Sequence, residues 1–184
     1  MKKTISLMLI AVCSLCYAQE KEQSSEKNFF GVQAGLLGTN VYNEYNLSKK
    51  FALRTDFNLE ASFFSRGDLT SKSGFALVPD ISVTPKWYYN ITKRDQEGKN
   101  TRHNAANYIS ARVGFIPDWF VISNIDGLYT NPMIYVAPTW GFRRNFARNF
   151  NYEFQVGMGV GKILKDDYPL QAVPNLSFRI GYDF

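Results

Sequence analysis

The stretch VPNLSFRIGYDF, residues 173–184, alternates between apolar and polar side chains without a break. A strict period of two predicts a strand with one apolar face and one polar face. The apolar row runs to the final residue, where a free strand edge would invite association with other chains. A strand that closes a barrel by pairing with the first strand has no free edge, so we expect a closed barrel. The apolar row consists of Leu176, Phe178, Ile180, Tyr182 and Phe184.

The first 18 residues have the order of a secretory signal peptide. Lys2 and Lys3 give a basic start, residues 5–16 are largely apolar, and Ala18 ends a small-residue cleavage site. About 12 apolar residues are too few for a membrane-spanning helix, which needs ~20. We therefore expect residues 1–18 to be cleaved after export through the inner membrane. A short amphipathic first element is the alternative.

The two cysteines, Cys13 and Cys16, both lie in this segment, so the mature chain has none. This excludes a disulfide scaffold and a cysteine-based metal or redox site, and leaves a lipid anchor on one cysteine as an alternative. Removing Lys2 and Lys3 lowers the formal net charge from +5 to +3. So mild a charge does not demand a nucleic-acid partner, and none is expected.

The composition is rich in aromatic residues, which make up 16% of the chain, with eleven Tyr and fifteen Phe. They need an extensive apolar surface to pack against. The mean hydropathy of -0.24 is nevertheless that of a soluble protein. A membrane barrel reconciles the two observations, because each lipid-facing residue is followed by a polar, lumen-facing one. No mature segment has 18 consecutive apolar residues, which excludes a transmembrane helix.

The rest of the chain divides into a polar leader, residues 19–28, and one domain, residues 29–184. We expect turns at 38–40 and 48–50, bulges at the prolines within 75–89, and a long irregular connection over 91–107. No helical periodicity is evident after residue 18. The alternating pattern predicts eight strands, at residues 29–38, 41–47, 51–63, 75–89, 108–122, 133–145, 151–161 and 170–184.

The polar pleats of these strands carry charged side chains of both signs. The interior of an eight-stranded barrel is only wide enough for side chains, so we expect these charges to form a salt-bridged plug in the lumen. A narrow polar conduit is the alternative. The predicted lumen network consists of Glu44, Arg54, Asp56, Glu60, Asp80, Lys86, Arg112, Arg143, Glu153 and Arg179.

Candidate catalytic residues are few. The single histidine, His103, lies in the charged connection 91–107 without an evident partner. There is no HExxH, CxxC, P-loop or GxSxG motif. Gly157, Gly159 and Gly161 alternate with apolar residues in one strand, which indicates close packing rather than a phosphate-binding loop. We therefore expect no catalysis, no cofactor and no metal.

The signal peptide, the alternating strands, the absence of mature cysteines and the aromatic last strand together resemble the eight-stranded outer-membrane β-barrels of Gram-negative bacteria, of the OmpA/OmpX kind. The resemblance covers residues 29–184 as a pattern. It implies that the row from Leu176 to Phe184 is an insertion signal read by periplasmic chaperones and the barrel-assembly machinery. It also implies that both termini and the 91–107 connection are periplasmic. The long periplasmic connection and the short outer loops depart from the family's pattern.

The sequence thus predicts an all-β, eight-stranded, antiparallel, up-and-down transmembrane β-barrel in the cell outer membrane, with outer-membrane lipid as its surroundings. The expected role is structural or accessory. Two other functions stay open. One is a narrow channel for ions or small solutes, and the other is a secreted, lipocalin-like barrel or sandwich with its aromatic side chains turned inward around an apolar ligand.

Overall fold

A computed structural model of the protein describes residues 27–64, 74–165 and 168–184. The predicted signal peptide, Cys13 and Cys16 lie outside the described residues, and so does the leader up to residue 26. Asn28, which we expected to end the leader, is the first residue of strand β1.

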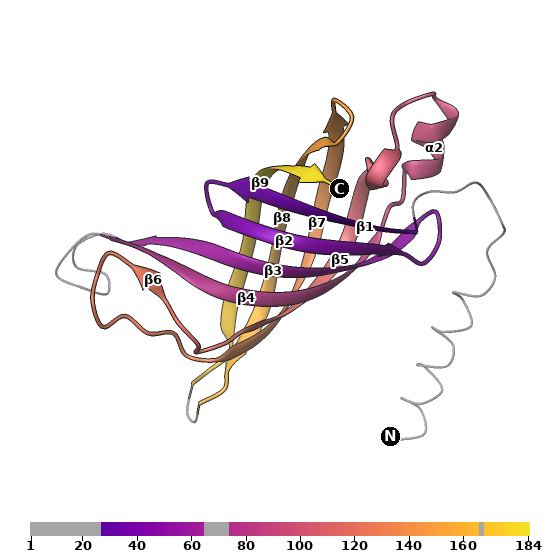
Figure 1. Cartoon of the computed structure of the whole chain (residues 1–184). Coiled ribbons are helices and arrows are strands. Elements are labelled where there is room, and N and C mark those ends of the chain that lie inside the picture. Colours follow the sequence, from indigo (N-terminus) through magenta and orange to yellow (C-terminus); the bar gives the residue numbers. More distant parts are fainter. Residues whose placement is uncertain (1–26, 65–73, 166–167) are drawn as a thin grey trace, which may run out of the picture.

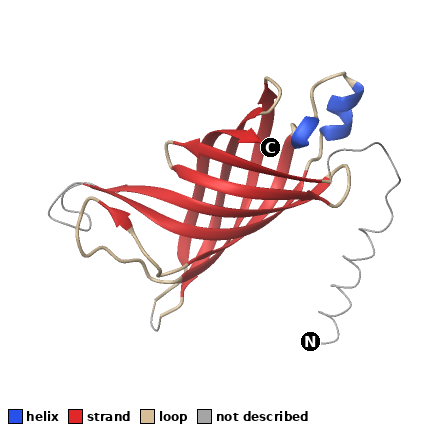
Figure 2. Cartoon of the chain, in the orientation of Figure 1, coloured by secondary structure: helices blue, strands red, loops and turns tan. Residues whose placement is uncertain are grey.

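The described chain is built almost entirely of strands (Figure 2). Two short helical segments, α2 (Ile91–Gln96) and the 3₁₀ turn η1 (Arg102–Asn104), interrupt them. The strands are β1 (Asn28–Gly35), β2 (Gly38–Asn46), β3 (Phe51–Phe64), β4 (Gly74–Trp87), β5 (Asn107–Ile116), β6 (Ile122–Ser123), β7 (Met133–Phe146), β8 (Phe150–Ile163) and β9 (Gln171–Asp183).

All these strands belong to one antiparallel sheet that closes into a ring (Figure 1). Around the ring the order is β1, β2, β3, β4, β5, β7, β8 and β9, and β9 then pairs with β1. In this closing pair Val32 lies opposite Tyr182. The two-residue strand β6 stands outside the ring and pairs with β4, with Ile122 opposite Leu77. The all-β antiparallel fold and the pairing of the last strand with the first are therefore confirmed.

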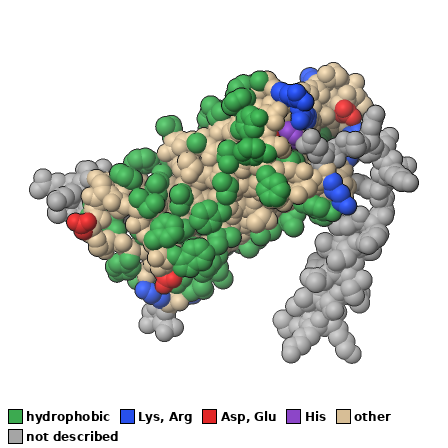
Figure 3. Space-filling model, viewed as in Figure 1, with side chains coloured by type: hydrophobic (Ala, Val, Ile, Leu, Met, Phe, Trp, Pro, Cys, Tyr) green, Lys and Arg blue, Asp and Glu red, His purple; other side chains and the backbone are tan. Residues whose placement is uncertain are grey.

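Side chains alternate between the inside and the outside of the ring, and the apolar ones point outward. In β9, Phe178 is 53% exposed whereas the next residue, Arg179, is 4% exposed. In β3, Phe57 is exposed and Asn58 is fully buried. The space-filling view accordingly shows apolar side chains spread over the visible outer surface of the strands (Figure 3).

The structure corrects two local predictions in the first half of the chain. The turn predicted at 38–40 lies at residues 36–37, and Gly38 already pairs with Gly35. Gly38 has φ of 126°, and a Cβ there would lie 2.1 Å from the Leu59 carbonyl oxygen, so the glycine marks a close approach rather than a turn. The predicted bulges are also wrong, because β3 and β4 pair without interruption from Phe51–Trp87 to Phe64–Gly74. 

A proline interrupts the pairing on the other edge of β4, where it faces β5. There the ladder with β5 lacks pairs between Val83 and Lys86, because Pro85 has no N–H to donate.

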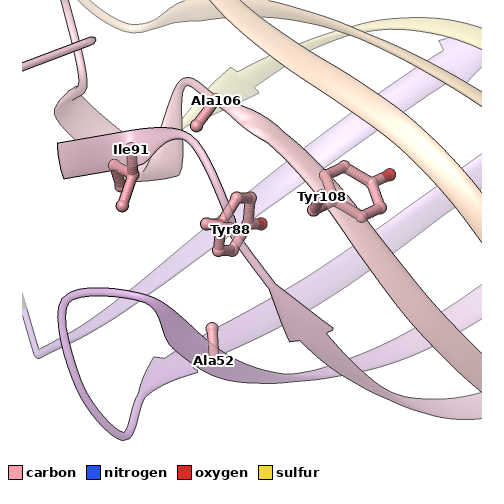
Figure 4. Close-up of a cluster of buried hydrophobic side chains, with 5 residues drawn as sticks. All are labelled: Ala52, Tyr88, Ile91, Ala106 and Tyr108. Atoms are coloured by element: carbon pink, nitrogen blue, oxygen red, sulfur yellow. The ribbon is translucent and has the colours of Figure 1, made fainter. Parts of the chain in front are cut away.

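The connection between β4 and β5, predicted to be irregular, is folded. Ile91 in α2 is buried against a cluster that comprises Ala52, Tyr88, Ala106 and Tyr108 (Figure 4). The Arg94 guanidinium donates a hydrogen bond of 2.9 Å to the carbonyl of Ala105. A helix of six residues is too short to leave a periodic apolar pattern, which is why the sequence did not indicate it. No helix in the described part of the chain is both long and apolar enough to cross a membrane.

The fifth predicted strand, 108–122, is also shorter than expected. Strand β5 ends at Ile116, directly before Pro117, and residue 122 instead begins β6. Proline lacks the N–H that would continue the ladder.

Candidate functional site

The interior of the ring is filled by polar and charged side chains, which form three layers. We name them by position. The rim cluster, at the end of the ring where β1 begins and β9 ends, comprises Tyr42, His103, Arg143, Asn151 and Asp183. The central cluster comprises Glu44, Arg54, Asp56, Lys86, Tyr108 and Glu153. The distal cluster comprises Asn58, Glu60, Asp80, Arg112, Tyr135 and Arg179.

Glu153 is the hub of the central cluster. Its Oε1 lies 2.8 Å from the Lys86 ammonium, and its Oε2 lies 2.8 Å from Nη1 of Arg54. The Tyr108 hydroxyl also donates to Oε1. A second carboxylate, that of Glu44, lies 3.3 Å from the Lys86 ammonium. Charge-assisted hydrogen bonds of this kind offset the cost of removing buried ions from water.

Arg54 extends the central cluster in two directions. Its Nε donates to Asp56 Oδ1 at 2.8 Å, and its Nη2 donates to the amide oxygen of Gln33 at 2.8 Å. The Gln33 amide nitrogen in turn donates to Asn151 Oδ1 at 2.8 Å. Gln33 therefore joins the central cluster to the rim cluster.

The rim cluster is built around the carboxylate of Asp183. Arg143 Nη2 lies 2.5 Å from Oδ1 and 2.7 Å from Oδ2, and the Tyr42 hydroxyl also donates to Oδ1. His103 Nδ1 lies 3.1 Å from Oδ2, and the imidazole stacks on the Phe29 ring at a centroid distance of 4.9 Å. The structure therefore gives His103 two partners that the sequence does not make evident. The imidazole is buried between β1 and β9, whose closeness the linear sequence does not reveal.

The β4–β5 connection closes this end of the ring, and we call residues 88–106 the cap. His103 and Asn104 have φ of 45° and 59°, a conformation that turns both side chains inward. The Asn104 amide donates to Glu44 Oε1 at 2.5 Å, and the Tyr88 hydroxyl donates to the same oxygen at 2.6 Å. Burial, reinforced by the charge of Glu44, raises the pKa of the Tyr88 phenol well above its ordinary value. The cap is thus bonded directly to the central cluster.

The distal cluster is held by two arginines. Arg112 Nη2 lies 2.5 Å from Asp80 and 3.0 Å from Glu60, and Arg179 Nη2 lies 2.8 Å from Glu60. The Tyr135 hydroxyl donates to Asp80 at 2.7 Å. The Glu60 side chain is 29% exposed, so the interior is wetter at this end than at the capped end.

A cavity of about 10 Å³ lies between Arg54, Asn58, Lys86 and Arg112. About 10–15 Å³ is the least that a single water molecule requires. The interior is therefore packed at this level rather than hollow.

The ten residues predicted for the lumen network all face the interior, and each lies within an ion pair of the three clusters. The five residues of the predicted insertion signal, Leu176, Phe178, Ile180, Tyr182 and Phe184, lie on the outer side, each at least 36% exposed.

Three interior tyrosines were missed by the sequence analysis, and each lies opposite a glycine on a neighbouring strand. The pairs are Tyr42 with Gly31, Tyr108 with Gly141, and Tyr135 with Gly114. A Cβ at any of the three glycines would lie within 2.6 Å of the paired ring, so the ring covers the glycine. The sequence analysis assigned the aromatic residues to apolar surface in general and did not place these three. Their position in the alternation, on the same pleat as Glu44, Arg112 or Arg143, was the signal that could have placed them inside.

In the described ranges, 27–64, 74–165 and 168–184, no group of three or more His, Cys, Asp or Glu side chains is arranged to hold a metal ion. The chain matches no protein-family model, no curated protein and no solved structure in the comparisons made.

Proposed function

We propose that the protein is an outer-membrane β-barrel of structural or accessory role, exported by a cleaved signal peptide. The observation that carries this proposal is the inverted distribution of side chains. Arg54, Arg143 and Glu153 are buried inside the ring, while Phe178, Ile180 and Leu176 are at least half exposed outside it. In water this apolar surface would stay exposed at a cost in free energy, whereas in a membrane the lipid acyl chains would cover it.

Strand lengths and aromatic positions support the same proposal. The eight strands of the ring have 8 to 14 residues, and a tilted strand needs about 9–11 to cross the hydrocarbon core. At the capped end the outward face carries a band of aromatic residues, in which the Trp140 indole donates to the Tyr89 hydroxyl at 3.0 Å. Such a band is typical of the interface between lipid and water. Its members are Phe51, Trp87, Tyr89, Trp140, Phe146, Phe150, Tyr182 and Phe184.

The filled interior favours a closed barrel without transport or catalysis. Ion pairs occupy the lumen, and the cap closes one mouth. His103 is engaged by Asp183 and Phe29 rather than placed beside a serine nucleophile. The proposed partners are outer-membrane lipid and, during biogenesis, periplasmic chaperones and the barrel-assembly machinery that would read the outward row of β9. No cofactor is proposed.

Of the two other functions, the narrow channel has one observation in its favour, the partial exposure of Glu60 in the distal cluster. The lipocalin-like function requires an apolar interior. The charged clusters inside the ring give it no support.

Fractionation of cells that express the full chain tests the proposal. We expect the protein in the outer-membrane fraction, shortened by the first 18 residues, and migrating at different positions on a gel before and after boiling. A chain that lacks residues 1–18 is the control and should remain in the cytoplasm. Recovery of the full chain from the periplasm or the medium in soluble form would overturn the proposal.

A further inference from the structure

The capped end of the ring is surrounded on its outside by basic side chains, which we call the basic collar. They come from the residue before β1, the β2–β3 turn, the cap and the β7–β8 hairpin. In the described part of this outer surface the acidic side chains are Asp95 and Glu97. The collar consists of Lys27, Lys49, Lys50, Lys93, Arg94, Lys99, Arg102, Arg144 and Arg148.

Contacts between these segments show that the collar is one surface. Lys49 lies 2.8 Å from Asp95, which links the β2–β3 turn to the cap. Arg102 Nη1 donates to the carbonyl of Arg148 at 3.4 Å, which links the cap to the β7–β8 hairpin. The space-filling view shows basic side chains gathered at this end (Figure 3).

Among the described residues at this end of the ring, the nine basic side chains of the collar outnumber the two acidic ones. Glu97 is already shared between Lys99, at 2.6 Å, and Lys93, at 4.0 Å, and Asp95 is paired with Lys49. At the opposite end of the ring the described surface is balanced, because two acids accompany two bases there. These are Asp118, Asp126, Lys162 and Lys165.

The collar lies at the same end of the ring as the aromatic band, and two of its basic side chains lie beside further outward aromatic rings. The Lys27 ammonium is 5.8 Å from the centre of the Tyr45 ring, and the Arg144 guanidinium is 5.4 Å from that of Phe142. Basic side chains beside outward aromatic rings place their charge where lipid headgroups begin. The ligand that fits the collar is therefore an anion held at the boundary between lipid and water.

We propose that the basic collar binds the phosphate groups of anionic phospholipids in the leaflet at the capped end. This inference rests on the proposed membrane location. Clusters of Lys and Arg next to a membrane-spanning segment attract lipids whose headgroups carry a negative charge. The collar thereby fixes the depth and orientation of the ring in that leaflet and holds a shell of anionic lipid around it.

Quenching of tryptophan fluorescence by brominated lipid tests this proposal. The chain has three tryptophans. A Trp119→Phe variant keeps only Trp87 and Trp140, both on the outward face near the collar. The protein is refolded into vesicles of phosphatidylcholine with 20 mol% phosphatidylglycerol, about the proportion of a mildly anionic bilayer, and either lipid is supplied in brominated form. We expect phosphatidylglycerol to be enriched about threefold or more at the reporters, and the enrichment to fall as salt is raised.

A pair of matched variants locates the effect. Lys50→Gln with Arg148→Gln removes two collar charges and should lower the enrichment about twofold or more. Lys162→Gln with Lys165→Gln removes two charges from the opposite end and should leave it unchanged. Equal quenching by the two lipids in an inserted, heat-modifiable protein would overturn the collar proposal alone. Absence of quenching by either lipid would overturn the membrane location as well.

Discussion

At the scale of single residues, Glu153 decides the charge balance of the central cluster. Its two oxygens contact Lys86 and Arg54 at 2.8 Å each, and all three side chains are buried. A buried cation that loses its carboxylate cannot turn to water. The remaining acceptor near Lys86 is Glu44, at 3.3 Å.

Glu153→Gln should therefore destabilise the protein by about 3–5 kcal/mol, the cost of breaking one buried ion pair. Equilibrium unfolding in denaturant, with the protein refolded into lipid vesicles, measures the change. Glu97→Gln, which alters an exposed pair on the cap, is the control and should leave the unfolding midpoint unchanged. An unaltered midpoint for Glu153→Gln would mean that the network does not hold the ring together.

At the scale of elements, neighbouring strands are matched to each other by the glycine–tyrosine pairs. Tyr135 on β7 covers Gly114 on β5, and its hydroxyl continues to Asp80 on β4. The Tyr135 side chain thereby holds β7, β5 and β4 in register. Its hydroxyl reaches Asp80 only because the glycine leaves room for the aromatic ring.

Gly114→Ala should destabilise the ring by about 1–3 kcal/mol, because the new Cβ would lie 2.2 Å from the Tyr135 ring. Tyr135→Ala removes the aromatic ring with which this Cβ would clash. In a double-mutant cycle, measured by the same unfolding experiment, the two substitutions together should cost less than the sum of each alone. Strict additivity would show that the pair does not interact.

The cap is an element of a different kind, since it is held by a few buried bonds rather than by a ladder. Asn104 supplies two of them, to Glu44 at 2.5 Å and to Asn46 at 2.6 Å, in a left-handed conformation that asparagine tolerates well. The segment before it carries Lys93, Lys99 and Arg102, where trypsin cleaves once the cap opens.

Asn104→Ala should increase the rate of tryptic cleavage in the cap about fivefold or more, because buried hydrogen bonds are lost and alanine strains at this φ. The rest of the ring should stay folded, as judged by heat-modifiable migration on a gel. Asn124→Ala is the control; it removes the side-chain oxygen that accepts a hydrogen bond of 2.9 Å from the Phe75 N–H at the other end of the ring. Equal cleavage rates in the two variants would contradict this view of the cap.

At the scale of the whole molecule, the interior determines whether ions can cross. The side chains of the three clusters leave a cavity of about 10 Å³ between the central and distal layers. A path for ions would require several of the buried pairs to separate together.

The refolded protein should therefore carry no steady current in a planar bilayer at neutral pH. Single-channel recording at 1 M salt, where electrostatic attraction between surface charges is screened, is the measurement. A large-pore porin in the same bilayer shows that the recording detects open channels. Stepwise, reproducible conductance from the protein would favour the narrow channel over the closed barrel.

The sequence by itself determined the all-β fold, its antiparallel strands and the alternation of polar and apolar faces, because a period of two is a local property that survives in every register. It also indicated the closing role of the last strand through the row from Leu176 to Phe184. The strand ends at Gly38 and Ile116 were predicted wrongly. The close approach of Gly38 to the backbone of β3, and the ladder hydrogen bond that Pro117 cannot donate, both depend on the neighbouring strand.

Only the tertiary structure decided how the interior is connected. Asp183 meets His103 and Arg143, and Tyr108 meets Glu153, across separations of at least 40 residues that no local pattern records. The cap escaped prediction for the same reason, because its short helices are stabilised by what they contact and not by their own periodicity. The alternation of residues along a strand determines whether a side chain lies inside or outside the sheet. The closure of the sheet into a ring determines which other side chains it contacts there.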